Sequence, residues 1–138
     1  MRAILIVDDE LGVRESLKMI LKPIYQVHTA MDGIEALQSI QNEKIDVVAL
    51  DLKMPGPSGI DVLRQIKENY PDIEVIIITA YGSAENAKEA LRYGAGDFIT
   101  KPFNASDLVN SVNKSIERRS TNLRYKNFNR YNSAVIRN

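Results

Sequence analysis

Short apolar runs alternate with amphipathic stretches along the first 117 residues of the chain. Residues 3–7, 47–50 and 73–78 are rich in Ile, Val and Leu and have the length of buried strands. Residues 24–28 and 97–100 are more mixed and predict two further short strands. Between and after them, apolar residues recur at three- and four-residue steps, which predicts five helices. The regular alternation favours an α/β fold with a parallel sheet covered by helices on both faces.

The predicted helices differ in how much apolar surface they can bury. Their expected inward residues are Val13, Leu17, Ile20 and Leu21 in the first, Ile34, Leu37 and Ile40 in the second, Ile60, Leu63 and Ile66 in the third, and Leu108, Val109, Val112 and Ile116 in the fifth. The fourth begins near Ser83, stops at Gly94, and offers mainly Ala84, Ala87, Ala90 and Leu91. Small residues bury little area, so we expect this helix to be held less tightly than the others.

Polar and charged residues stand where the predicted strands end. Asp8 and Asp9 follow the first strand, Asp51 the third, Thr79 the fourth and Lys101 the fifth. Because the carboxyl ends of parallel strands share one edge of a sheet, these side chains are expected in one crevice. Three carboxylates there need a cation, and oxygen-only ligands suit Mg²⁺. A metal, an Asp nucleophile, a hydroxyl and a Lys are the groups that phosphoryl transfer to a carboxylate requires.

The segment after Asp51 predicts a rigid loop. Two prolines and two glycines follow within residues 55–59, and Ser58 with Asp61 has the spacing of a capping box that opens a helix. Asp51 alone would be a common turn residue, because Asp is frequent after strands. The other strand-end residues are what favour a functional role.

Composition and charge exclude several classes of protein. With 138 residues, 44% of them hydrophobic, the chain is expected to form one globular domain. It has no cysteine, so it has neither disulfides nor thiolate chemistry. Dinucleotide-binding proteins have a glycine-rich loop after the first strand, where this chain has Asp8, Asp9 and Glu10. This difference argues against dinucleotide binding. The apolar runs are too short to span a membrane, and we expect a cytoplasmic protein.

The spaced motifs together resemble the receiver domain of bacterial two-component response regulators. The resemblance covers residues 3 to about 117 and is carried by Asp8-Asp9, Asp51 with Met54-Pro55 and Gly59, Thr79-Ala80, Gly94-Ala95 with Asp97-Phe98, and Lys101-Pro102-Phe103. The run Thr79 to Ser83 is similar to receivers of the nitrogen-regulator type. The resemblance implies a doubly wound, flavodoxin-like sheet of strand order 2-1-3-4-5, and a signalling domain that is not an enzyme but assists its own phosphorylation and slow dephosphorylation.

The resemblance also implies a role for each residue of the crevice. Asp51 would accept a phosphoryl group from a sensor histidine kinase, and Asp8, Asp9, Asp51 and the backbone carbonyl of Lys53 would bind Mg²⁺. Thr79, Ala80 and Lys101 would receive the phosphoryl oxygens, with a cis peptide between Lys101 and Pro102. Thr79 and Phe98 would form the switch, and Lys53 and Tyr81 would tune dephosphorylation.

Two other functions share part of this pattern. A phosphatase of the haloacid dehalogenase type also uses a strand-end Asp with Mg²⁺, but it needs a second Asp two residues later, where this chain has Lys53. A receiver-like interaction module that is not phosphorylated would be expected to lack one of the five key side chains, and all five are present.

Residues 118–138 form a basic extension. They hold six bases and no acid, whereas residues 1–117 hold 12 bases and 18 acids, a net charge of −6. Tyr125, Phe128, Tyr131 and Val135 recur at helical steps, which predicts a partial continuation of the fifth helix that can pack on a second copy; five asparagines oppose helix formation. The segment is expected to be a linker to an output domain or effector, or the end of a stand-alone receiver, with nucleic-acid binding disfavoured.

Overall fold

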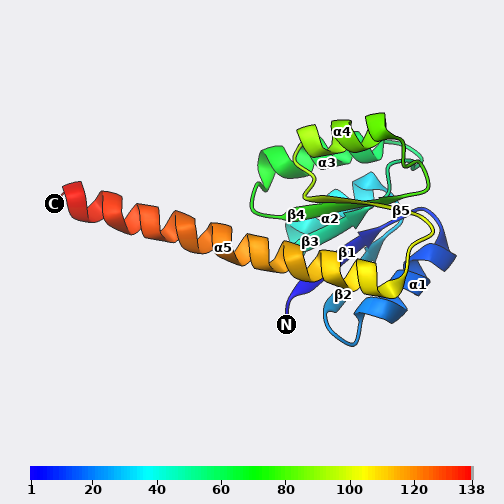
Figure 1. Cartoon of the computed structure of the whole chain (residues 1–138), viewed down its shortest axis with the longest axis horizontal. Helices are drawn as coiled ribbons and strands as arrows, with labels where there is room; N and C mark the ends of the chain where they lie inside the picture. The colour runs from blue at the N-terminus through cyan, green and yellow to red at the C-terminus, as the bar shows by residue number, and fades with distance from the viewer. Residues whose placement is uncertain (138) are drawn as a thin grey trace.

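A computed structural model describes residues 1–137, with side chains described through residue 132. It confirms a five-stranded parallel sheet of order β2-β1-β3-β4-β5 (Figure 1). The strands are β1 (Ala3–Val7), β2 (Gln26–Ala30), β3 (Val47–Leu50), β4 (Glu74–Thr79) and β5 (Asp97–Thr100). The helices are α1 (Leu11–Leu21), α2 (Gly33–Asn42), α3 (Gly59–Asn69), α4 (Ala84–Arg92) and α5 (Ala105–Arg137).

Helices cover both faces of the sheet and enclose one apolar layer on each side. On one face α1 and α5 contribute Leu17, Leu21, Leu108 and Val112, which pack with Ile4, Ile6, Ile76 and Ile78 of the strands. On the other face α2, α3 and α4 contribute Ala36, Ile40, Leu63, Ile66 and Ala90. β1, β3 and β4 are buried along their whole length because both faces are covered, as their continuous apolar runs predicted.

Strand register brings the predicted site residues to one edge. Val7 pairs with Leu50 across β1 and β3, so Asp8 and Asp51, the next residues of each strand, emerge side by side. Thr79 pairs with Thr100 across β4 and β5, which brings Lys101 to the same end of the sheet. The crevice therefore lies at the carboxyl edge, beside the point where the strand order reverses.

Three local predictions are wrong. The second strand covers Gln26–Ala30, not residues 24–28, because the α1 turn continues through Tyr25, whose amide donates to the Leu21 carbonyl. Ile34 is 58% exposed on α2, whose buried residues are Gly33, Ala36 and Ile40. On α4 Ala90 alone is buried, and Leu91 is 52% exposed. α4 is therefore even more weakly anchored than its alanines predicted.

α5 is the longest helix, with 33 residues, and it runs past the sheet. It begins after Asn104, whose side-chain oxygen accepts the Asp107 amide proton at 2.8 Å, as the capping spacing predicted. Its first four turns pack on the sheet, and its remaining turns extend away from the domain (Figure 1). None of the helices in residues 1–137 combines the length and the apolar character needed to span a membrane.

Candidate functional site

An acidic cluster lies at the carboxyl edge of β1 and β3. Asp8 and Asp51 are 2% and 8% exposed, Asp9 is exposed, and carboxylate oxygens of all three lie within 4.8 Å of one another. The Oδ1 atom of Asp51 is buried and has no hydrogen-bond partner among the described residues. A buried, unpaired carboxylate oxygen beside two further carboxylates fits a Mg²⁺ ion, which takes oxygen ligands at close range.

Lys101 supplies the positive charge of the cluster. Its ammonium donates to Asp8 Oδ2 at 2.7 Å and lies 3.6 Å from Asp51 Oδ2. The peptide bond from Lys101 to Pro102 is cis. Burial alone would lower the pKa of Lys101, but the hydrogen bond to Asp8 and the charge of Asp51 outweigh it and raise that pKa. Burial raises the pKa of the Asp51 carboxyl, and the neighbouring Thr79 hydroxyl and the charge of Lys101 offset only part of this rise.

Thr79 and Ala80 form the neighbouring wall of the site. Thr79 is fully buried at the end of β4, and its hydroxyl oxygen accepts the Tyr81 amide proton at 3.2 Å. Ala80 borders an open cavity of about 450 Å³ that also reaches Asp51 and Lys101. The cavity lies directly over the acidic cluster, and the small side chain of Ala80 leaves room beside Asp51.

The loop after Asp51 is held in place because its last residues pack back against the backbone that follows β3. Gly59, the first residue of α3, donates its amide proton to the Leu52 carbonyl at 2.8 Å. A Cβ atom at Gly59 would collide with the backbone carbonyl oxygen of Asp51. Ser58 caps α3 by accepting the Asp61 amide proton, as its spacing predicted. The glycine thus allows the close approach that holds Asp51 in place.

Lys53 and Tyr81 face each other across the mouth of the cavity. The Lys53 ammonium lies 4.1 Å from the centroid of the Tyr81 ring, a cation–π contact. Both residues line the cavity that contains Asp51. The sequence indicated each residue separately, but no spacing rule predicted that they touch.

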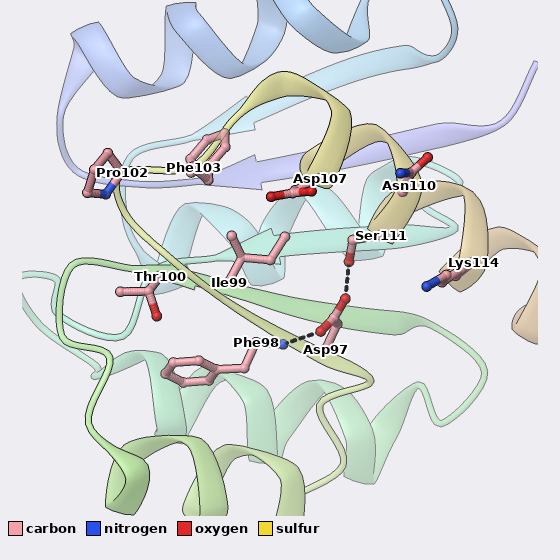
Figure 2. A pocket seen from close by; sticks show the side chains of 10 residues that line it. All are labelled: Asp97, Phe98, Ile99, Thr100, Pro102, Phe103, Asp107, Asn110, Ser111 and Lys114. Carbon is pink, nitrogen blue, oxygen red and sulfur yellow. Dashed lines mark hydrogen bonds between the residues drawn. The ribbon is translucent and has the colours of Figure 1, made fainter.

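Phe98 lies away from the acidic cluster, on β5. Its side chain is partly buried against the layer that contains Ala90 of α4, whereas the neighbouring Ile99 packs on the α5 side. Figure 2 shows the two side chains on opposite sides of β5. Asp97 fixes this part of the strand, because its carboxylate accepts the Phe98 amide proton at 2.8 Å and the Ser111 hydroxyl of α5 at 2.6 Å. Ser111 lines a second cavity beside α5 and was not predicted as a site residue.

Arg14 is a second residue that sequence reasoning missed. Its guanidinium donates to the backbone carbonyl of Asp8 at 2.8 Å, and the Glu10 amide donates to Asp8 Oδ1 at 3.0 Å. These bonds hold the turn between β1 and α1 and orient the Asp8 carboxylate toward Lys101. The sequence could have indicated this contact, because Arg14 lies one turn into a helix that follows the acidic pair Asp8-Asp9.

Comparison with known proteins identifies the family. Residues 4–113 match the response regulator receiver domain. Sporulation initiation phosphotransferase F of Bacillus subtilis is 38% identical over 118 residues, which cover 85% of this chain and 95% of that protein. The regulatory protein LuxO of Vibrio cholerae is 36% identical over 115 residues, 83% of this chain but 25% of LuxO. The chain thus spans nearly all of some relatives and a quarter of others.

Solved structures agree with the sequence comparison. A receiver domain protein from Methanospirillum hungatei, described as CheY-like, aligns with a TM-score of 0.84 and 32% identity over 88% of this chain and 98% of that one. NtrX from Brucella abortus aligns with a TM-score of 0.87 and 32% identity over 93% of this chain and 30% of NtrX.

The fold and the acidic site define a signalling domain, and the chain belongs to the receiver domain family of two-component response regulators. Aspartate phosphorylation and Mg²⁺ binding are typical of this family, whose members interact with histidine kinases and output domains. The relatives found are response regulators, so neither the phosphatase nor the unphosphorylated module gains support.

Proposed function

We propose that this chain accepts a phosphoryl group on Asp51 from a sensor histidine kinase and changes conformation in response. The observation that carries the proposal is the position of Asp51 between Asp8 and Lys101, with one buried oxygen that no described residue binds. In the transfer, an Asp51 oxygen bonds to phosphorus as the bond from phosphorus to the imidazole nitrogen of the donor breaks. The imidazole is the leaving group.

Asp8, Asp9, Asp51 and the backbone carbonyl of Lys53 would hold Mg²⁺. A bound Mg²⁺ supplies the positive charge that lets an anionic donor approach three carboxylates. The chain's own contribution is electrostatic and positional: Lys101 already lies within 4 Å of both Asp8 and Asp51 and can pair with a phosphoryl oxygen. Thr79 would donate its hydroxyl to another oxygen, and Ala80 leaves the approach open.

The conformational response would involve Thr79, Phe98 and α4. Thr79 currently accepts the Tyr81 amide proton, so donating to a phosphoryl group would draw the start of the β4–α4 loop toward Asp51. α4 buries Ala90 alone, and Phe98 is partly buried beside it. A helix with so small an anchor can have two arrangements that differ by only a few kcal/mol.

Lys53 and Tyr81 would govern how long the phosphoryl group survives. Their cation–π contact closes part of the cavity mouth over Asp51. A water molecule that attacks the phosphoryl group in line has to pass this pair. We therefore propose slow hydrolysis, with Tyr81 as the shield and Lys53 as the residue that holds it.

The experiment is phosphorylation by acetyl phosphate, followed by intact mass. The parent protein in Mg²⁺ should gain one phosphoryl group, whereas Asp51→Asn should gain none because its amide is not a nucleophile. Asp61→Asn is the matched control, since Asp61 lies in the first turn of α3 and its amide, not its carboxylate, makes the capping bond. Labelling of Asp51→Asn at the parent level, or of the parent in excess chelator, would contradict the proposal.

A further inference from the structure

The final turns of α5 form an arm that extends past the receiver sheet. We define the arm as residues 120–137, which continue α5 beyond the sheet in Figure 1. The family match ends at residue 113, before the arm begins. The arm is about 27 Å long and contacts the receiver near its start, through Ser120 and Lys126.

Ion pairs at the amino edge of the sheet fix the direction of the arm. The amino-edge clamp consists of three pairs: Arg118 with Glu74, Arg119 with Asp46, and Lys126 with Asp72. In the central pair the Arg119 Nε atom lies 3.0 Å from Asp46 Oδ1, and the Asp46 side chain is 4% exposed. Because the clamp holds Arg119 and Lys126, which are seven residues apart, one face of the helix is turned toward the receiver.

The opposite face of the arm is aromatic and exposed. Phe128 and Tyr131 lie about 200° and 140° around the helix from Lys126, so the clamp turns both away from the receiver. They are 61% and 68% exposed, and the adjacent Tyr125 is 66% exposed. Three large rings in water on successive turns form an unpartnered surface. The fourth predicted member of the stripe, Val135, has a side chain outside the described residues.

Two of the three basic residues in 120–132 lie away from the aromatic rings. Lys126 is held by Asp72, and Arg130, four residues later, shares its face. Arg124 alone lies on the aromatic face, between Phe128 and Tyr131 in helical projection. A nucleic-acid site or an acidic partner would need several bases among the rings. One base among three rings does not meet that need, so the surface fits a largely uncharged aromatic partner.

We propose that the arm pairs with the arm of a second copy, antiparallel, through Tyr125, Phe128 and Tyr131. A twofold axis at Phe128 places the two Phe128 rings together and each Tyr125 opposite Tyr131 of the second copy, because the three residues are evenly spaced. The same axis places Arg124 opposite Asn132. A parallel pair would instead bring the two Arg124 side chains together.

The antiparallel arrangement also separates the two receivers. Residues 1–117 carry a net charge of −6, so two receivers repel each other when they are close. With Phe128 on the axis, the clamp residues Arg119 and Lys126 lie about 14 Å and about 3 Å of helix before the crossing point, so the two receivers attach to their arms on opposite sides of it. Aromatic pairs of this kind contribute beyond the area they bury. The pairing does not depend on Asp51 and is independent of the proposed function.

Sedimentation velocity of the full chain over a concentration series tests the pairing. The parent should self-associate, and Phe128→Lys should weaken association by about tenfold or more because it places two charges on the axis. Asn122→Lys is the matched control, with the same added charge on an exposed residue one turn before Lys126 and about 120° around the helix from Phe128, and should associate like the parent. A parent that stays monomeric, or equal weakening by both variants, would overturn the proposal.

Cysteine cross-linking tests the orientation, since the chain has no cysteine of its own. Under mild oxidation, Tyr125→Cys with Tyr131→Cys should form a covalent dimer, whereas Tyr125→Cys alone should form little, because its counterpart is residue 131 of the second copy. Efficient dimerisation of the single variant would indicate a parallel pair and overturn the antiparallel assignment. Binding of a monomeric parent to vesicles of mixed neutral and anionic lipid, lost in Phe128→Lys, would overturn the proposal in favour of a membrane surface.

Discussion

Replacing Arg119 with leucine should destabilise the whole domain, although this residue lies far from the acidic site at the carboxyl edge of the sheet. Arg119 is 13% exposed and pairs with Asp46, whose side chain is 4% exposed. It also donates to the Asp72 carbonyl at 2.6 Å. Leucine keeps part of the aliphatic stem but removes the charge, so the Asp46 carboxylate stays buried with less compensation.

The size of the loss follows from what remains around Asp46. Breaking a buried ion pair by removing one partner costs roughly 3–5 kcal/mol. Asp46 keeps the hydrogen bond from the Ala3 amide at 2.9 Å, and the half-exposed Arg2 lies 3.9 Å away. Because these partners remain, we expect the free energy of unfolding to fall by about 3 kcal/mol, the lower end of that range. For a domain of this size, such a loss lowers the melting temperature by about 6–12 °C.

Urea unfolding followed by circular dichroism measures the loss. Arg124→Leu is the matched control, because Arg124 is exposed on the same helix and should change stability by less than about 0.5 kcal/mol. The deficit of Arg119→Leu should persist in high salt, since buried pairs are weakly screened. Adding Asp46→Asn should cost less in the Arg119→Leu background than in the parent. Equal stability of the two arginine variants, or strict additivity of the double variant, would refute the argument.

Two further predictions concern the site. Tyr81→Ala should shorten the lifetime of the phosphoryl group because it removes the ring that faces Lys53. The loss of the phosphoryl group over time can be followed by intact-mass measurement. If the variant loses it at the same rate as the parent, Tyr81 has no part in the mechanism. Beryllofluoride with Mg²⁺ should shift the amide resonances of residues 80–103 in NMR spectra, because α4 is weakly anchored and Phe98 packs beside it. Shifts confined to the loop after Asp51 would contradict that switch.

The sequence predicted the sheet and the crevice well because both depend on simple periodicity. β1, β3 and β4 are built on apolar runs; Asp8 and Asp51 directly follow β1 and β3, and Thr79 is the last residue of β4. Parallel strands share a carboxyl edge, so the position of Asp51 beside Asp8 followed from the topology. The detailed roles of these residues stay predictions until phosphorylation is measured.

The sequence could not predict contacts that depend on side-chain direction across loops. Lys53 meets Tyr81, and Asp97 binds Ser111, although each pair joins segments far apart or on different elements. Local pattern also failed for the second strand, because Ile24 and Tyr25 are as β-prone as residues 26–30, and the hydrogen bond from Tyr25 to α1 decides the boundary.

The extension after residue 117 shows how composition alone can mislead. Six bases without an acid and five asparagines argue against a helix, whereas the spacing of the aromatic residues predicted at least a partial one, and the helix continues through Arg137. The difference arises because the inward face of α5, which includes Leu108, Val112 and Ser115, continues in register into Arg119. The acids that this face meets lie at or just before the starts of β3 and β4, and only the folded sheet brings those starts together. A chain ended at the predicted boundary, residue 117, would lose Arg118 and Arg119 from buried carboxylates, and we expect it to be less stable than the full chain.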